Sequence, residues 1–217
     1  KHFSHPDKKI RDKAVAVFSK WVSRQENLED EDHVRLWKAL FYCYWMSDKG
    51  PVQRELAERL SALINVCANQ QQAERFIRAF YTTMQREWAG IDRLRMDKFY
   101  NLIRCFQKET FAFLAKSNWR SASIAWVNKI VSEGPLGLNH DGEALPCKNP
   151  GLQLHMVDIV LEEITEALND GITVESWMGV LEPYLELLSS VVDKAVFDRV
   201  YQRIFEVLAG KQWLSAS

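Results

Sequence analysis

The chain has 217 residues, of which 47% are hydrophobic, and this is enough for one substantial core or two small ones. Nine glycines and six prolines are few beside eight tryptophans and eleven phenylalanines, which disfavours β-rich and low-complexity architectures. The net charge of −1 gives no indication of nucleic-acid binding. The two halves differ, however: residues 1–116 hold 21 Lys and Arg against 15 Asp and Glu, whereas residues 117–217 hold 7 against 14. We expect one continuous helical domain with halves of opposite charge.

Apolar residues recur at the helical period from the start of the chain. Pro6 and Asp7 are placed to open the first helix. The second helix is apolar around most of its circumference, so we expect neighbours on several of its sides. Gly50 and Pro51 end it and open the third. The apolar positions of the first helix are Ile10, Ala14, Val17, Phe18, Trp21 and Val22.

The next three helices complete a regular series. Gly90 is expected to end the fourth helix, Asp92 to cap the fifth, and residues 117–132 to form a shorter sixth. Helix starts near residues 6, 30, 51, 70, 93 and 119 match the length of α-solenoid pairs, although no motif repeats. The prediction is an all-α, HEAT- or armadillo-like α-solenoid of about nine helices packed as antiparallel pairs, with a compact orthogonal bundle as the alternative.

The last third contains an irregular stretch and three more helices. Residues 133–151 hold four glycines and three prolines without periodicity, which predicts an irregular loop that is mobile or is a partner-binding arm of the single domain 1–217. Helices are expected over residues 154–168, 173–191 and 193–209, with Thr173 and Asp193 as caps. Pro183 is expected to kink or split the second of these helices.

Cysteine usage and hydropathy indicate a reducing compartment. The first three of the widely spaced Cys43, Cys67, Cys105 and Cys147 lie inside apolar helical patterns, which predicts buried free thiols. No run of about 18 apolar residues and no secretory signal pattern is present, so we expect no membrane partner.

The sequence offers little for catalysis. Asp30 and His33 come nearest to a metal-ligand spacing, but an acidic residue before a helix start is usually a cap. Glu162 and Glu166 lie one helical turn apart, with His155 two turns before Glu162, yet no nucleophile or apolar pocket is predicted beside them. We predict no enzyme activity, no metal, no cofactor and no small-molecule substrate.

Two helix faces are candidates for partner binding. On the fifth helix, the face with Arg93, Arg104 and Lys108 is mostly basic, and it is either ordinary surface or a contact for RNA phosphate or an acidic protein. Asp97 and Asn101 share this face. On the second helix, the outer pole is either covered by another helix or is a protein-docking patch. It holds Arg35, Lys38, Tyr42 and Met46.

Arg95 differs from these arginines because it falls within the apolar stripe of the fifth helix. An unpaired guanidinium there is costly, so Arg95 is expected to pair with a carboxylate, Glu87 and Asp48 being the first candidates. The alternative is that it reaches solvent past the first turn of the helix.

Two segments carry a family resemblance. LWKALFYCYWMSDK (residues 36–49) and REWAGIDRLRMDKFYNLIR (residues 86–104) closely resemble signature segments of the nucleolar ribosomal-RNA-processing protein one family. Residues 151–168 (GLQLHMVDIVLEEITEAL) are similar to a third, more loosely. The signature positions are Trp37, Trp45, Asp48, Glu87, Trp88, Gly90, Asp92 and Arg95.

The resemblance implies an all-helical HEAT-like domain of the nucleus and nucleolus, without catalytic residues. It implies a scaffold in assembly of the large ribosomal subunit that is needed for rRNA maturation, with other assembly factors of the pre-ribosome as partners. Because the chain is near neutral, we expect protein contacts to dominate. The alternative is an RNA-binding module that contacts pre-rRNA through the basic N-terminal half.

Overall fold

The computed structural model describes residues 2–167 and 172–210, and within them all regular secondary structure is helical apart from one isolated bridge. The all-α prediction is therefore confirmed. The helices group into two compact units, Lys1–Phe113 and Leu114–Ser217, which we call unit 1 and unit 2. The single continuous domain stays a prediction.

Unit 1 holds four helices and most of a fifth, and the starts of all five lie within two residues of those expected. Asp7 and Asn69 accept hydrogen bonds from the backbone N–H groups of Lys9 and Gln72, as N-caps do. The helices are α1 (Lys8–Val22), α2 (Asp30–Trp45), α3 (Gly50–Ser61), α4 (Gln70–Glu87) and α5 (Arg93–Lys116).

Gly90 does not end α4 directly, which corrects the prediction. The helix stops at Glu87, and the chain tightens into a 3₁₀ turn, Trp88–Gly90, before α5 begins. Such tightening is common at helix ends because it supplies partners to the last carbonyl groups. Gly90 thus belongs to the segment that connects α4 to α5.

The core of unit 1 is aromatic and centres on α2, which packs most closely with α4. Trp37 is fully buried, and its ring centroid lies 4.9 Å from those of both Phe76 and Phe80 and 5.3 Å from that of Phe106. The rings of Phe80 and Phe106 stack at 3.7 Å. Stacking of alternate helices, such as α2 on α4, is the arrangement of an α-solenoid.

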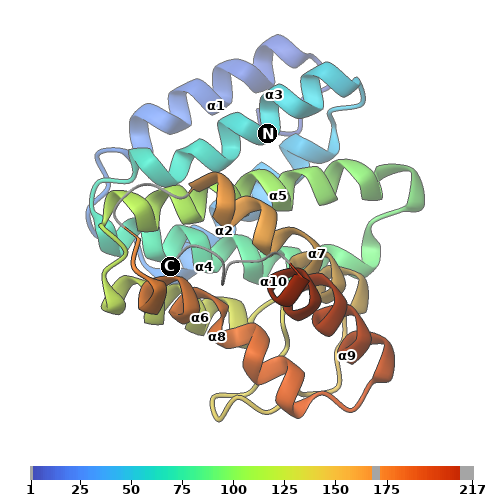
Figure 1. The fold of residues 1–217 in the computed structure, drawn as a ribbon. Coiled ribbons are helices and arrows are strands. Elements are labelled where there is room, and N and C mark those ends of the chain that lie inside the picture. The colour runs from blue at the N-terminus through green and yellow to red at the C-terminus, as the bar shows by residue number, and fades with distance from the viewer. Residues whose placement is uncertain (1, 168–171, 211–217) are drawn as a thin grey trace. The chain divides into compact units, whose positions relative to one another are not determined.

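In Figure 1, α1 lies beside α3 at the edge of unit 1. Arg59 of α3 pairs with Asp12 of α1 at 3.1 Å, and Lys8 pairs with the same carboxylate. The core-facing side of α1 is closed by Val15, Phe18 and Val22, all buried. On the flank of this side, Val17 and Trp21 are exposed.

Unit 2 repeats the same mode of packing, with α6 closest to α8 and α7 to α9. Thr173 and Asp193 cap α8 and α9, as expected. The elements are α6 (Ser121–Glu133), α7 (Pro150–Ala167), α8 (Val174–Ser190), α9 (Lys194–Val200), a π-helical turn η3 (Tyr201–Phe205) and α10 (Glu206–Gly210). The predicted end of the seventh helix at Leu168 lies outside the described residues.

Pro183 does not split α8, which is one continuous helix from Val174 to Ser190. The expected split is therefore wrong, while the kink stays a prediction. Proline removes one backbone donor, and its ring crowds the preceding turn, but packing can hold such a helix together. Pro183 and the neighbouring Tyr184 are both buried.

The loop between α6 and α7 folds back onto unit 2 and differs from the expected arm. Leu136 and Leu138 are buried, and the side-chain amide of Gln153 donates to the carbonyl of Leu136 at 2.6 Å. Gly137 and Gly142 have φ of 69° and 78°, the left-handed region that glycine tolerates. The first part of the loop is therefore packed into unit 2, whereas Leu145 further along is 52% exposed.

The four cysteines are free, as predicted. Of the three expected to be buried, only Cys43 is; Cys67 and Cys105 are half-buried, as is Cys147. Burial raises the pKa of the Cys43 thiol to about 11 and that of Cys67 to about 12, so both thiols are unreactive at neutral pH. Among the described helices, none combines the length and apolar character needed to cross a bilayer.

Candidate partner-binding surface

The two segments that carry the family resemblance meet in unit 1, where the end of α2 packs against the start of α5. The guanidinium of Arg95 lies over the indole ring of Trp45, 4.9 Å from its centroid. Phe99 stacks on Phe41 at 4.8 Å and meets Tyr44 edge-on at 5.3 Å. These contacts join the two helices by aromatic and cation–π interactions.

Arg95 pairs with a carboxylate, but not with either of the predicted ones. Its Nη1 lies 2.5 Å from the Asp92 carboxylate in the same helical turn. Glu87 instead pairs with Arg86 at 2.8 Å, and Asp48 approaches Lys98 at 3.9 Å. Residues three apart on a helix are neighbours, so Asp92 reaches Arg95 without help from another element.

Asp92 also caps α5, because it accepts a hydrogen bond from the backbone N–H of Arg95 at 3.2 Å. Arg95 holds the pKa of this carboxyl below its usual range. The favourable interaction is therefore present at neutral pH and is lost in acid, as pH falls through that lowered pKa.

Asp92→Ala is expected to lower the melting temperature by about 2–4 °C, because it removes both the cap and the ion pair. Asp92→Asn keeps an oxygen for the cap and should lose less. Scanning calorimetry measures both, and an unchanged melting temperature for Asp92→Ala contradicts the role of Asp92 as the start of α5.

Lys98 is a buried cation that the sequence pattern did not single out. Its side chain is only 4% exposed, and its Nζ donates to the carbonyls of Trp45 at 2.7 Å and Ser47 at 2.8 Å. These oxygens lie at the C-terminal end of α2, where carbonyls lack helical partners and a cation is favoured. The Tyr44 hydroxyl in turn donates to the Lys98 carbonyl at 2.8 Å.

We call the group of Tyr44, Trp45, Asp92, Arg95 and Lys98 the α2–α5 lock. Every member holds one helix to the other or starts α5, and all five lie in segments that resemble the family signature. Trp37 and Trp88 belong to the buried core beside it. The residues of this lock therefore contribute to helix packing and to the start of α5.

The outer face of α2 is one such surface. Tyr42 is 40% and Met46 is 36% exposed, so no helix in the described part of the chain covers them. Arg35 and Lys38 are exposed on the same side, and Arg35 pairs with Glu31 at 3.1 Å. Of the two expectations for this face, the covering helix is absent from the described structure, and the docking patch stays a prediction.

The basic face of α5 is less uniform than expected. Arg93 and Lys108 are exposed, but Arg104 is half-buried. The exposed Asp97 lies between Arg93 and Arg104 in the sequence, and its negative charge weakens the positive potential of this face.

The residues weighed for chemistry do not come together. His33 is buried, and its Nε2 lies 2.9 Å from Gln72, while Asp30 approaches Arg75 at 3.3 Å. Glu162 and Glu166 are exposed and His155 is half-buried. Over residues 2–167 and 172–210, no group of three His, Cys, Asp or Glu side chains converges as a metal site would require.

The fold defines an all-helical protein of the α-solenoid type, in which the α2–α5 lock joins two helices of unit 1. The chain belongs to the family described as nucleolar protein Nop52, whose sequence profile matches residues 1–217. This confirms the resemblance stated above.

Known relatives support the same assignment. The chain is 31% identical over 203 residues to human ribosomal RNA processing protein 1 homolog A, and 31% identical over 202 residues to the Caenorhabditis elegans homolog. It is 29% identical over 207 residues to mouse homolog B. These matches cover 91–93% of this chain, but only 43%, 49% and 28% of the respective relatives. The chain thus spans less than half the length of each.

Proposed function

We propose that this chain is a non-catalytic scaffold of ribosome biogenesis in the nucleolus. In this role it is needed for pre-rRNA processing during assembly of the large subunit, and it acts through protein contacts within pre-ribosomal particles. Family membership and relatives named for ribosomal RNA processing support the pathway. The observation that carries the mechanism is the exposed apolar surface of unit 1, including Tyr42 and Met46, on a chain with net charge −1.

The proposal is tested by purifying the tagged protein from nucleolar extract with and without nuclease. Assembly proteins should remain bound after the RNA is digested. Loss of every partner on digestion would favour the alternative, and complete absence of the tagged protein from pre-ribosomal particles contradicts the proposal.

Tyr42→Ala tests the outer face of α2. Because Tyr42 is 40% exposed, its removal should change the free energy of unfolding by no more than about 0.5 kcal/mol. Recovery of assembly proteins should fall several-fold if the face binds a partner. Tyr201→Ala, at a similarly exposed tyrosine of unit 2, is the matched control. Equal recovery with the two variants removes this face from the proposal.

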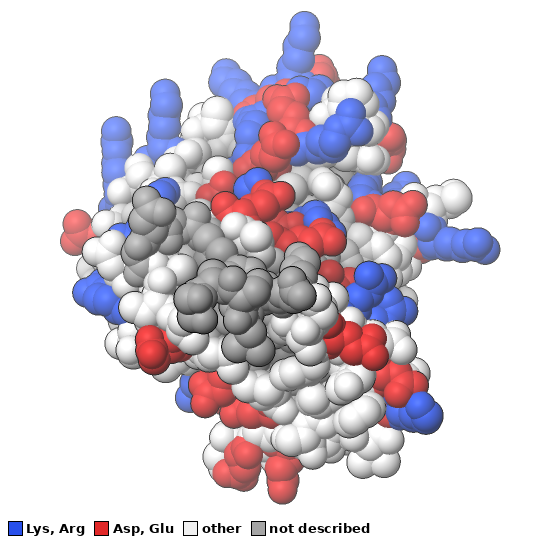
Figure 2. Space-filling model, viewed as in Figure 1, with Lys and Arg blue, Asp and Glu red and all other residues white. Residues whose placement is uncertain are grey.

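The alternative is direct contact of unit 1 with pre-rRNA. Figure 2 shows Lys and Arg side chains standing out over α1 and α3, which favours it. It predicts that the purified protein binds rRNA fragments with a steep salt dependence, and that charge reversal at Arg93, Arg104 and Lys108 abolishes binding. The interspersed Asp97 and the half-buried Arg104 argue for the protein-contact mechanism instead.

A further inference from the structure

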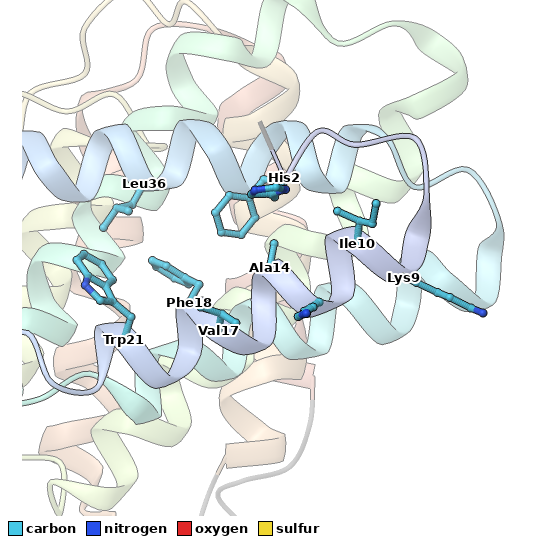
Figure 3. Close-up of a pocket in the computed structure, with 10 residues that line it drawn as sticks. His2, Lys9, Ile10, Ala14, Val17, Phe18, Trp21 and Leu36 are labelled. Carbon is cyan, nitrogen blue, oxygen red and sulfur yellow. The ribbon is translucent and has the colours of Figure 1, made fainter.

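An apolar groove of about 930 Å³ runs along the flank of α1 beside Leu36 of α2, next to the side of α1 that packs on the core of unit 1. Figure 3 shows Phe18 and Trp21 of α1 directed toward Leu36 of α2. Val17 is 59% and Trp21 is 41% exposed, although both continue the apolar stripe of α1. No described segment covers them, and large apolar side chains gathered in this way mark interaction sites.

The N-terminal segment closes part of the groove. Phe3 meets Phe18 edge-on, with ring centroids 5.9 Å apart, and Trp21 lies at the same distance from Phe18 on the other side. The aromatic floor is therefore preformed, and a ligand entering the groove meets an apolar surface that is already held in place.

One rim of the groove is strongly basic. At 100° per residue, Lys9, Lys13 and Lys20 fall within about 40° of one another, beside the stripe of Val17 and Trp21. All three are exposed, and none forms an ion pair within the described residues. Asp12 lies on the far side of α1 and is neutralised by Lys8 and Arg59. The rim thus keeps its positive charge for a ligand.

The dimensions of the groove suit a helix. The 15 residues of α1 extend about 22 Å, which is four turns of a second helix laid against it. Amphipathic helices bind in such grooves through apolar side chains at i, i+3 or i+4 and i+7. Carboxylates on the flank of a bound helix would face the basic rim.

An RNA strand fits the groove less well. Single-stranded RNA binds through a series of exposed aromatic faces along a basic track. Of the rings in the lining, only Trp21 and the small imidazole of His2 are exposed, and aliphatic Ile10, Val17 and Leu36 supply much of the wall. These side chains favour apolar residues of a protein.

We propose that the α1–α2 groove binds an acidic amphipathic helix from another protein of the pre-ribosomal particle. This inference rests on the proposed function and deepens it by naming the chemistry of one partner. The apolar face of the helix packs on Val17, Trp21 and Leu36, and its Asp and Glu residues pair with the lysines of α1.

A peptide selection tests the proposal directly. A displayed library of helical 18-residue peptides, varied at eight surface positions, is selected on the purified protein. The enriched peptides should be acidic and amphipathic. Their affinity, measured by fluorescence polarisation, should fall at least tenfold for Val17→Asp and for the double variant Lys13→Glu, Lys20→Glu. Charge-reversed peptides should recover binding to the double variant.

Leu94→Asp is the matched control, because Leu94 is 94% exposed on α5 and does not line the groove. It should leave peptide affinity unchanged, and circular dichroism should show all variants folded. The proposal is overturned if no groove-dependent peptide is enriched, or if the enriched peptides are neutral or basic. It is also overturned if rRNA fragments, and not peptides, lose binding in the double variant.

Association with particles separates this inference from the proposed function. Wild-type protein that is absent from pre-ribosomal particles contradicts the proposed function, whatever the peptides show. Wild-type protein that is present, with no acidic groove ligand in the selection, overturns the groove inference alone.

Discussion

Trp37→Ala is expected to reduce the free energy of unfolding by about 3–5 kcal/mol and to unfold much of unit 1 at physiological temperature. Trp37 is fully buried among Phe76, Phe80 and Phe106, whose rings lie within 5.3 Å of it. Removing the indole leaves a cavity between α2, α4 and α5 that rigid aromatic neighbours fill poorly. Urea unfolding followed by circular dichroism measures the loss.

Trp37→Phe is the control for this prediction. Within the described structure, the indole Nε1 of Trp37 has no hydrogen-bond partner, so phenylalanine removes an unsatisfied buried donor while keeping most of the ring volume. We expect a loss of only about 1–2 kcal/mol. If both variants lose the same stability, the aromatic cluster is not what holds these helices together.

Local signals in the sequence were enough to place the helices. Thr173 and Asp193 cap α8 and α9 as predicted, because a cap depends on a side chain and the backbone two or three residues away. The start of α5 followed from Asp92 for the same reason. Local chemistry of this kind can be read without knowing the fold.

Contacts between helices, and the burial that results from them, could not be predicted in the same way. Nothing in the periodicity distinguishes Lys98 from an exposed lysine, since its burial depends on the end of α2, some fifty residues earlier. Similarly, Val17 and Trp21 read as core positions of α1, because periodicity shows that a stripe is apolar but does not show how much of it is covered. The groove therefore appears only in the structure.

The candidate surfaces could be predicted only in part, because a helical wheel shows the face on which a residue lies but not what covers that face. Tyr42 and Met46 stood out because they lie opposite the core stripe of α2, and both are exposed. Arg104 was assigned to the same basic face as Arg93, yet it is half-buried, because a helical wheel does not include neighbouring helices. Sequence located the faces, and packing decides which residues on them are accessible.

The stability of the chain should rise at alkaline pH because of Lys98. Burial lowers the pKa of its ammonium from the usual 10.5 to about 8. Between these values the unfolded chain holds the proton and the native chain does not, so the free energy of unfolding increases with pH in this window. The full contribution is about 3 kcal/mol, at about 1.4 kcal/mol for each pH unit of pKa difference. It is the second largest effect that we expect.

Lys98→Met isolates this effect, since the thioether is of similar length and does not titrate. At pH 7 the variant leaves the carbonyls of Trp45 and Ser47 without their donor, which opposes the gain from removing a buried charge. The wild-type stability minus that of Lys98→Met should therefore increase from pH 7.5 to pH 10.5 in urea unfolding. Lys20→Met, at an exposed lysine of α1, corrects for the loss of charge itself. If the stability difference between the wild type and Lys98→Met does not change with pH, the prediction is wrong. The two carbonyls, with Asp48 at 3.9 Å, would then offset the cost of burying the charge, and Lys98 would stay charged in the folded protein.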